Sequence, residues 1–314
     1  MRGGRREAFN VIVAFLAIVA LAGTASPARA QGEVEERVYT VALFAPDINF
    51  SDAISKAGFV NAVASALSSR TGLKWRGQSF GQAGDFSAAA RSGGVDYAII
   101  GGTYCASSCV GTPVAFASGQ GAMSVVGRGA ESVAAMRGRT LILPQPSKAY
   151  EGFVSATLLG HQVEASEFFV IKTTGDARSA LAAVQIGQAD LTVAFDAYAV
   201  GLGVLYKTSA SPLPVVTQVN QALDPELAAR IASAFRGVGV QGGGIITGFG
   251  GSGEGLQAFR GFAFSKAPAL RPSMASARPL RLRFPVISAA GLDRLSDARQ
   301  ETLIPTPELR EEAP

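Results

Sequence analysis

The chain has 314 residues, a formal net charge of +4 and 48% hydrophobic residues. This length exceeds one average domain, and the apolar content is sufficient for a substantial core. The first 30 residues contain four arginines and one glutamate, so the rest of the chain is close to neutral. Nucleic-acid binding requires basic residues gathered on one face, and no basic run interleaved with aromatic residues occurs. The composition therefore argues against a nucleic-acid partner.

The N-terminus has the order of segments found in secretory signal peptides. Arginines precede an apolar run from Val11 to Ala22, and a stretch of small residues ends at Ala30. The run is short for a membrane span, which needs about 20 residues; a retained anchor is the alternative. We expect residues 1–30 to be a signal peptide cut after Ala30. The mature protein would then be periplasmic or secreted, without a stable membrane span.

The segments after Arg37 alternate between strand and helix patterns. A strand is predicted to end at Pro46, and a helix capped by Ser51 or Asp52 to end at Gly72. The strand "LKWRGQSF", the helix "DFSAAARSGG" and the strand "VDYAIIGG" follow. This order predicts an α/β unit with a largely parallel sheet.

The same alternation returns after residue 120 and predicts a second α/β unit. The predicted strands are "GAMSVVGRG", "RTLILP", "EFFVIKTTG" and "ADLTVAFD". The predicted helices are "AESVAAMRG", "EGFVSATLLG" and "DARSALAAVQIGQ". A further strand, "LPVVTQV", and the helix "DPELAARIASAFRG" precede a glycine-rich segment.

The glycine-rich segment, residues 235–255, contains the spacing G-x-G-x-x-G twice. A dinucleotide-binding loop needs these glycines between a strand and a helix. The first set follows a helix, where Gly237 is a predicted helix end. The second precedes only the short helix "EGLQAFRG", with no acidic residue at the end of a following strand. We therefore predict a flexible surface connection and no nucleotide cofactor.

Cys105 and Cys109 are the only cysteines. In an exported protein such a close pair favours a local disulfide, with a free pair or a redox role as alternatives. Together with His161, the only histidine, they fall short of the usual four ligands of structural zinc. His161 is predicted at a helix end, no G-x-S-x-G motif occurs, and no carboxylate pair suits acid–base chemistry. We therefore predict neither a metal site nor an enzyme.

The loop "LPQPSKAYEGF" leaves a buried strand and opens directly into a helix. Backbone N–H groups at the helix start, with the side chains of Ser147, Lys148 and Tyr150, would form an anion-binding corner. The alternative is ordinary capping by Ser147 or Glu151.

Three other strand ends would face the same crevice, because ligands of open α/β sheets lie beyond the carboxyl ends of the strands. The candidates there are Phe44, Asp47, Tyr104, Asp196 and Tyr198. For each of them singly, loop packing or capping is the alternative.

The order of four segments resembles a known family. The segments are "VDYAIIGGTYCA", "MRGRTLILPQPSKAYEGF", "SALAAVQIGQADLTVAFD" and "LPVVTQVNQALDPELAARIASAF". From Arg37 to Phe264 the chain resembles the periplasmic solute-binding proteins of ABC importers with the type II binding-protein fold. It is most similar to the phosphonate/phosphite/phosphate-binding family.

The resemblance implies two α/β lobes, each a mixed, mostly parallel sheet flanked by helices, joined by crossover strands. Lobe 1 would comprise residues 37–117 and 213–270, and lobe 2 residues 118–212. Residues 271–314 would form a C-terminal extension whose last part is mobile. The resemblance also implies a ligand held between the lobes on hinge closure, and a membrane permease and its ATPase as partners.

The chain departs from the family at two places. Of the consecutive hydroxyl residues that the family carries in its anion loop, only Ser147 is present, and Asp176 and Ala177 stand where the family often has a His. Lys148 would attract an anion, whereas Glu151 would repel one.

We expect a small anionic, phosphonate- or phosphate-like, or polar solute in the cleft. The alternative is a sensor or interaction module with a degenerate cleft. The expected ligand-binding residues are Ser147, Lys148, Tyr150, Tyr104, Asp47 and Asp196.

Overall fold

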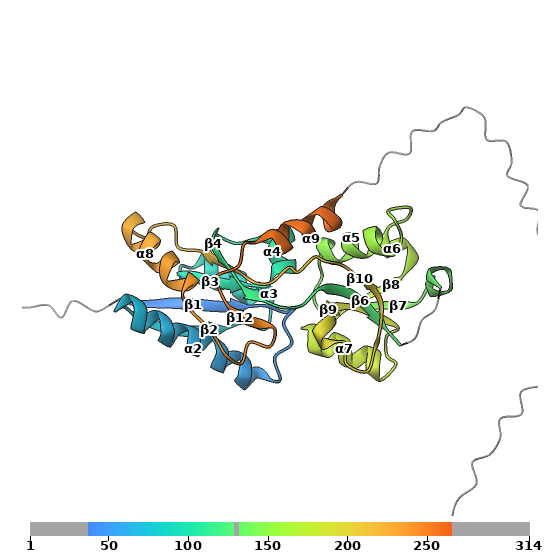
Figure 1. Ribbon diagram of the computed structural model, residues 1–314, viewed down its shortest axis with the longest axis horizontal. Helices are drawn as coiled ribbons and strands as arrows, with labels where there is room; N and C mark the ends of the chain where they lie inside the picture. Colours follow the sequence, from blue (N-terminus) through green and yellow to red (C-terminus); the bar gives the residue numbers. More distant parts are fainter. Residues whose placement is uncertain (1–36, 129–131, 266–314) are drawn as a thin grey trace, which may run out of the picture. The chain divides into compact units, whose positions relative to one another are not determined.

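The computed structural model describes residues 37–128 and 132–265. The predicted signal peptide, 1–30, and the predicted C-terminal extension, 271–314, lie outside these ranges. The described chain contains two five-stranded sheets, ordered β2-β1-β3-β11-β4 and β10-β6-β9-β7-β8. We call the part built on the first sheet lobe 1 and the part built on the second lobe 2 (Figure 1).

Lobe 1 has a mixed sheet. In it β1 pairs in parallel with β2 and β3, while β11 pairs antiparallel with β3 and β4. Its strands are β1 (Val38–Phe44), β2 (Lys74–Ser79), β3 (Tyr97–Ile100), β4 (Thr112–Phe116) and β11 (Val215–Gln218). Its helices are α2 (Ala53–Thr71), α3 (Ala83–Arg91), α4 (Gly102–Ser108) and α8 (Pro225–Arg236).

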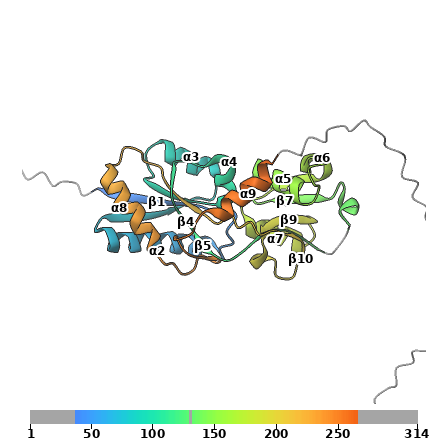
Figure 2. The same ribbon diagram turned by 45° about the horizontal axis from the view of Figure 1, so that its top comes forward.

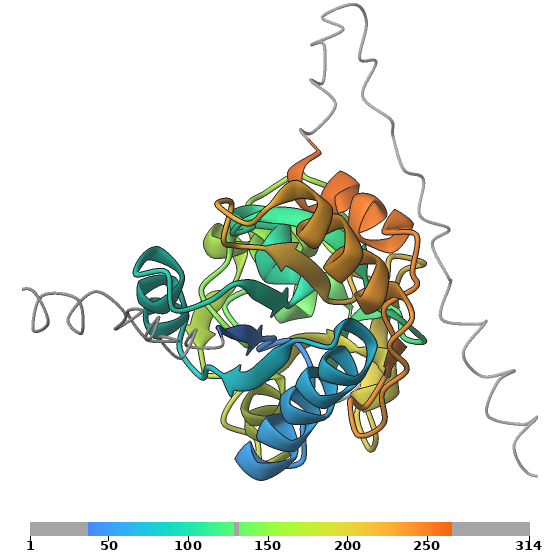
Figure 3. The same ribbon diagram turned by 90° about the vertical axis from the view of Figure 1, so that its left-hand side faces the viewer.

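Both faces of the lobe 1 sheet are covered, because successive side chains of a strand point to opposite faces. Val41 and Leu43 of β1 belong to the core cluster that includes buried residues of α2 and α8. Ala42 and Phe44 point to the other face and belong to the cluster that includes Phe86 of α3. Figure 3 shows α3 on one side of the sheet and α2 on the other. The buried runs of β1 and β3 therefore reflect strands covered on both faces.

Helix α2 begins and ends where the sequence predicts. The Asp52 side chain accepts a hydrogen bond from the backbone N–H of Ser55, and Gly72 ends the helix in the left-handed conformation at φ 72°. Of the two caps expected, Asp52 is the one used.

Lobe 2 also has a mixed sheet. Here β7 pairs in parallel with β8 and β9, while β6 pairs antiparallel with β9 and β10. Its strands are β6 (Met123–Gly127), β7 (Thr140–Leu143), β8 (Val170–Thr173), β9 (Leu191–Phe195) and β10 (Gly203–Lys207). Its helices are α5 (Lys148–Thr157), α6 (Ala165–Phe168) and α7 (Ala177–Gln185), with short 3₁₀ turns η1 (Val133–Met136) and η2 (Asp196–Tyr198).

The lobe 2 sheet is also covered on both faces. Leu141 and Leu143 of β7 join the cluster that contains the buried residues of α5 and α6. Ile142 packs with Ala180 and Val184 of α7 on the other face (Figure 2). No helix within the described ranges has the length and hydropathy that a membrane span needs.

The glycine-rich segment is packed against the crossovers between the lobes, so the prediction of a flexible surface connection is wrong. Its strand β12 (Ile246–Gly248) pairs with β5 (Ser118–Gly119) of the first crossover. A Cβ at Gly251 would lie 2.4 Å from the carbonyl oxygen of Ala117, and one at Gly255 would lie 2.2 Å from that of Ser211. Such distances exclude a side chain, and therefore explain glycine at both positions.

Helix α9 (Glu254–Phe264), which the sequence prediction assigned to lobe 1, packs against helices of both lobes (Figure 1). Phe259 stacks on Phe153 of α5 with ring centroids 5.2 Å apart. Gly152 permits this approach, because a Cβ there would lie 1.9 Å from the carbonyl oxygen of Ala263. The helix also contacts α4 of lobe 1.

Several elements differ from the predictions, and among them β4 is a strand that the sequence patterns did not mark. The stretch after β3, for which no helix is predicted, is helix α4, which begins at a glycine pair too poor in apolar periodicity to signal a helix. Glu167 and Phe168, predicted as the start of a strand, belong to the short helix α6 instead. Strand β10 was not predicted, because its side chains are largely exposed and only two are half-buried.

Candidate functional site

A buried hydrogen-bond network joins the two lobes. Thr103 of α4 lies with its Oγ1 3.0 Å from Asp47 Oδ2 and 3.0 Å from Tyr150 Oη of α5. A hydroxyl carries one proton and a carboxylate only accepts. Thr103 therefore donates to Asp47, and the Tyr150 hydroxyl donates to Thr103. Two residues expected at the site, Asp47 and Tyr150, are thus brought together through a third that the sequence analysis did not select.

The Asp47 carboxylate lies in a protein interior. Its side chain is 2% exposed, and the backbone N–H of Thr103 donates to Oδ2 at 3.2 Å. Oδ1 has no hydrogen-bond partner within the described ranges. It packs against Gly101, where an added Cβ atom would lie only 2.0 Å from it. Burial raises the pKa of Asp47 to about 6, although the hydrogen bonds from Thr103 and the charge of Lys56 oppose the rise.

A second contact between the lobes runs through the backbone. The N–H of Ala177, at the first turn of α7, donates to the carbonyl oxygen of Pro46 at 2.7 Å. The first N–H groups of a helix have no partner within the helix. The lobe 1 loop after β1 therefore satisfies one of the donors at the start of α7.

An open pocket of about 700 Å³ lies beside these contacts. Its lining comes from the end of β1 with the start of α2 (residues 45–56), the end of β2 (79–81) and the start of α7 (176–182). We call it the inter-lobe pocket, because the first two segments belong to lobe 1 and the third to lobe 2. Its size falls within the range of about 300–1,000 Å³ that is usual for small-molecule sites.

Lys56 supplies a half-buried ammonium group to the inter-lobe pocket. Its Nζ donates to the carbonyl oxygen of Phe80 at 2.5 Å. Burial lowers the pKa of Lys56, while the negative charges of Asp176 and Asp47 raise it. The chain therefore holds a cation at the boundary between the lobes, a position suited to an anionic group of a solute.

Three further charged residues line the pocket. Asp52 and Asp176 cap α2 and α7, and each accepts a hydrogen bond at Oδ1 from the backbone of its own helix. Arg178 is exposed on the first turn of α7. With Lys56, the lining thus carries two positive and two negative side chains. Ile48, Phe50 and Phe80 provide apolar surface between them.

The start of α5 is capped rather than open to the inter-lobe pocket. The Ser147 side chain accepts a hydrogen bond from the backbone N–H of Ala149. Lys148 faces solvent with 80% of its side chain exposed, and its Nζ forms a 2.8 Å ion pair with Glu151. The cation and the anion that the sequence analysis set against each other therefore neutralise one another.

The other two predicted site residues lie apart from this pocket. The Tyr104 ring packs edge-on against Phe44, with centroids 4.9 Å apart. Asp196 lies at the crossover and forms a 2.6 Å ion pair with Lys207, and its Oδ1 accepts from the N–H of Ala122 at 2.9 Å. Burial alone would raise the pKa of Asp196, but the hydrogen bond from Lys207 and the backbone N–H of Ala122 lower it.

Tyr198, which follows Asp196, reaches from lobe 2 toward lobe 1. A Cβ at Gly244 would lie 2.9 Å from its Oη, and burial raises the pKa of Tyr198 to about 12. Tyr198 therefore packs between the lobes but does not line the inter-lobe pocket.

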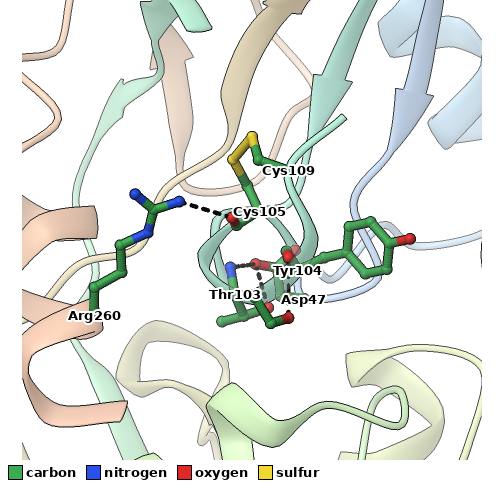
Figure 4. Close-up of a disulfide and its surroundings, with 7 residues drawn as sticks. Asp47, Thr103, Tyr104, Cys105, Cys109 and Arg260 are labelled. Carbon is green, nitrogen blue, oxygen red and sulfur yellow. Dashed lines mark hydrogen bonds between the residues drawn. A yellow bond between two sulfur atoms is a disulfide. The ribbon is translucent and has the colours of Figure 1, made fainter. Parts of the chain in front are cut away.

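Cys105 and Cys109 form a disulfide across the end of α4. Figure 4 shows it above the Thr103–Asp47 contact, with Arg260 of α9 donating to the carbonyl oxygen of Cys105 at 3.0 Å. The disulfide and Arg260 thus fix the helix that carries Thr103.

His161 lies after α5 in the left-handed conformation at φ 57°, and its Nε2 forms a 2.7 Å hydrogen bond with Ser265 Oγ. It does not line the inter-lobe pocket. Over residues 37–128 and 132–265, no group of three or more His, Cys, Asp or Glu side chains could hold a metal ion.

Of the six predicted ligand-binding residues, none lines the inter-lobe pocket. Of the four charged lining residues, Asp52 and Asp176 enter the sequence analysis only as a helix cap and as a departure from the family pattern. The two cations, Lys56 and Arg178, do not enter it at all. The position of Lys56 and Arg178 in the sequence could have indicated them. Each lies about one turn or less after a helix cap, Asp52 or Asp176, and each of these helices follows a strand, one in each lobe.

Comparisons with known proteins place the fold. No protein-family model matches the chain, and no curated protein matches it in sequence. Among solved structures, the binding protein component of a phosphonate ABC transporter from Pseudomonas aeruginosa matches with a TM-score of 0.56 and 13% identity, over 72% of this chain and 87% of that one.

Two further structures match at similar levels. The protein XAC2383 from Xanthomonas citri gives a TM-score of 0.53 at 14% identity, over 72% of this chain and 97% of that one. PhnD1 from Prochlorococcus marinus, in complex with methylphosphonate, gives 0.51 at 13% identity, over 65% and 85%. With two mixed sheets, helices on both faces of each and crossovers between them, the chain has the two-lobed type II fold of periplasmic solute-binding proteins.

Proposed function

We propose that the chain is an extracytoplasmic solute-binding protein that captures a small polar or anionic solute in the inter-lobe pocket and presents it to an ABC importer. The observation that carries this proposal is the pocket itself. Its charged lining comes from both lobes, with Lys56 on α2, Arg178 on α7 and Asp176 at the N-cap of α7. A solute that touches both sides would favour the closed arrangement of the lobes, because a ligand shifts a conformational equilibrium by its differential affinity.

The contacts beside the pocket support the same interpretation. The bond from Ala177 to Pro46 and the Tyr150–Thr103–Asp47 network hold the two lobes together only when they are close. A solute bound to both lobes would act in concert with these contacts, so that release requires all of them to break. One fold neighbour is the binding protein component of a phosphonate ABC transporter, which supports a permease and an ATPase as partners.

The binding step is tested by thermal shift with phosphate, phosphite, alkylphosphonates, sulfonates and amino acids. Ala182 is exposed on the pocket side of α7, so Ala182→Trp would fill the pocket without disturbing the core. Ala62→Trp, on an exposed position of α2 outside the pocket, is the matched control. We expect at least one solute to raise the melting temperature of the wild type and of Ala62→Trp but not of Ala182→Trp. No shift with any solute, or an equal shift in all three proteins, would contradict the proposal.

A second candidate is a sensor or interaction module with the same fold. The observation in its favour is that protein groups occupy the start of α5, where Ser147 caps the helix and Lys148 pairs with Glu151. Only the importer role requires the protein for uptake of its solute into the cell. If deletion of the gene abolishes uptake of the bound solute, the importer role stands, whereas unchanged uptake favours the sensor.

A further inference from the structure

We propose that the solute of the inter-lobe pocket is a small zwitterion with an apolar side chain, in the manner of an α-amino acid, and not a simple anion. This inference rests on the proposed function, because it concerns the ligand of the same pocket. The first observation is that the charges of the lining balance, because it contains two cations, Lys56 and Arg178, and two anions, Asp52 and Asp176.

The cationic side of the pocket has donors to offer. The Lys56 ammonium has three N–H donors and uses one on the carbonyl oxygen of Phe80. Arg178 forms no hydrogen bond with any other residue of the ranges that the structure describes. A carboxylate placed between them would receive charge-assisted hydrogen bonds, which are about twice as strong as neutral ones.

The anionic side has an acceptor to offer. Asp176 Oδ1 accepts from the backbone N–H of Ser179 at 2.8 Å, which caps α7. Its Oδ2 accepts from no other residue in the described part of the chain. Since a carboxylate accepts at both oxygens, the cap leaves one oxygen for an ammonium group of the solute.

A simple anion would suit this lining less well. A phosphate or phosphonate that met Lys56 would also meet the like charges of Asp52 and Asp176. A zwitterion compensates both signs at once, and its apolar side chain would cover Ile48, Phe50 and Phe80. The pocket volume of about 700 Å³ accommodates an amino acid and requires no longer ligand.

The test is titration calorimetry of the full mature chain with four probes. Leucine carries both charges, 4-methylpentanoate lacks the ammonium group, 3-methylbutylamine lacks the carboxylate, and methylphosphonate is the simple anion. We expect leucine to bind at least tenfold more tightly than each of the other three. If 4-methylpentanoate or methylphosphonate binds as tightly as leucine, the zwitterion is excluded while the solute-binding function stands. If no probe binds and the wider solute screen is also negative, both proposals fail.

Three variants locate the charges. Lys56→Met removes the ammonium group at similar length, and Asp176→Asn removes a negative charge but keeps a good N-cap. Each is expected to weaken leucine binding at least tenfold, and only Asp176→Asn should weaken 3-methylbutylamine. Lys172→Met, on exposed β8 outside the pocket, is the control and should change the affinity less than twofold. Unchanged leucine affinity in both pocket variants would overturn the proposal.

Discussion

The hydroxyl oxygens of Tyr150 in lobe 2 and Thr103 in lobe 1 lie 3.0 Å apart, and Thr103 in turn binds the buried carboxylate of Asp47. These three side chains lie within the protein, where an unmade hydrogen bond is costly. The hydrogen bond between Tyr150 and Thr103 therefore links the contact between the two lobes to the burial of the Asp47 carboxylate.

Removing the hydroxyl of Tyr150 should weaken this coupling. We expect Tyr150→Phe to lower the free energy of unfolding by about 1 kcal/mol, because Thr103 loses one hydrogen bond but keeps the one to Asp47. Chemical denaturation of the wild type and the variant measures the change. Tyr104→Phe is the control, since no hydrogen bond of its hydroxyl occurs in the described residues. Equal losses in the two variants would contradict the proposed role of the Tyr150 hydroxyl.

Asp47 should make stability depend on pH. Burial raises its pKa to about 6 from the ordinary 3.8, so the folded protein binds the proton more tightly than the unfolded chain. Its contribution is therefore most favourable below pH 3.8 and is lost as the pH rises through 6. The difference in pKa corresponds to roughly 3 kcal/mol.

The variant Asp47→Asn isolates this effect. We expect the wild type to lose stability relative to Asp47→Asn between pH 4 and pH 7, by up to roughly 3 kcal/mol. Denaturant titrations at several pH values give the two curves. Lys56 is the charged group that opposes the rise in pKa, so it must be kept in both proteins. Parallel curves would show that Asp47 titrates normally.

The glycines of residues 235–255 should differ sharply in their tolerance of substitution. Gly251→Ala would bring a methyl group within 2.4 Å of the carbonyl oxygen of Ala117, and we expect a loss of about 1–3 kcal/mol. At Gly250 the nearest atom would be the carbonyl oxygen of Arg236 at 3.7 Å, so Gly250→Ala should be nearly neutral. Thermal unfolding compares the two. Equal tolerance would mean that the segment does not pack on the crossover.

The disulfide should stabilise α4 modestly. The loop between Cys105 and Cys109 is short, with a sequence separation of 4. Reduction is therefore expected to cost about 2 kcal/mol. Because α4 carries Thr103, its amides should exchange hydrogen faster after reduction. The measurement is hydrogen exchange with and without reductant, with a variant lacking both cysteines as control; if α4 exchanges at the same rate in both states, the disulfide does not hold it.

The fold was largely predictable because its strands are covered on both faces and its helices are capped by recognisable residues. Asp52 and Gly72 bound α2 as their chemistry requires. The site was less predictable, because the positions of side chains depend on how the lobes pack. Lys148 was selected for its charge, yet Glu151 one turn later neutralises it. Lys56 was missed because a lysine in an amphipathic helix gives no local sign that it faces another lobe.

The central claim is that a solute binds between the lobes at the pocket formed by α2, the end of β2 and α7. A crystal structure of the protein with the solute that gives the largest thermal shift tests this claim most directly. We predict solute density within hydrogen-bonding distance of Lys56 Nζ and of the first turn of α7. Solute density against Ser147 at the start of α5, or outside the inter-lobe pocket, would contradict it.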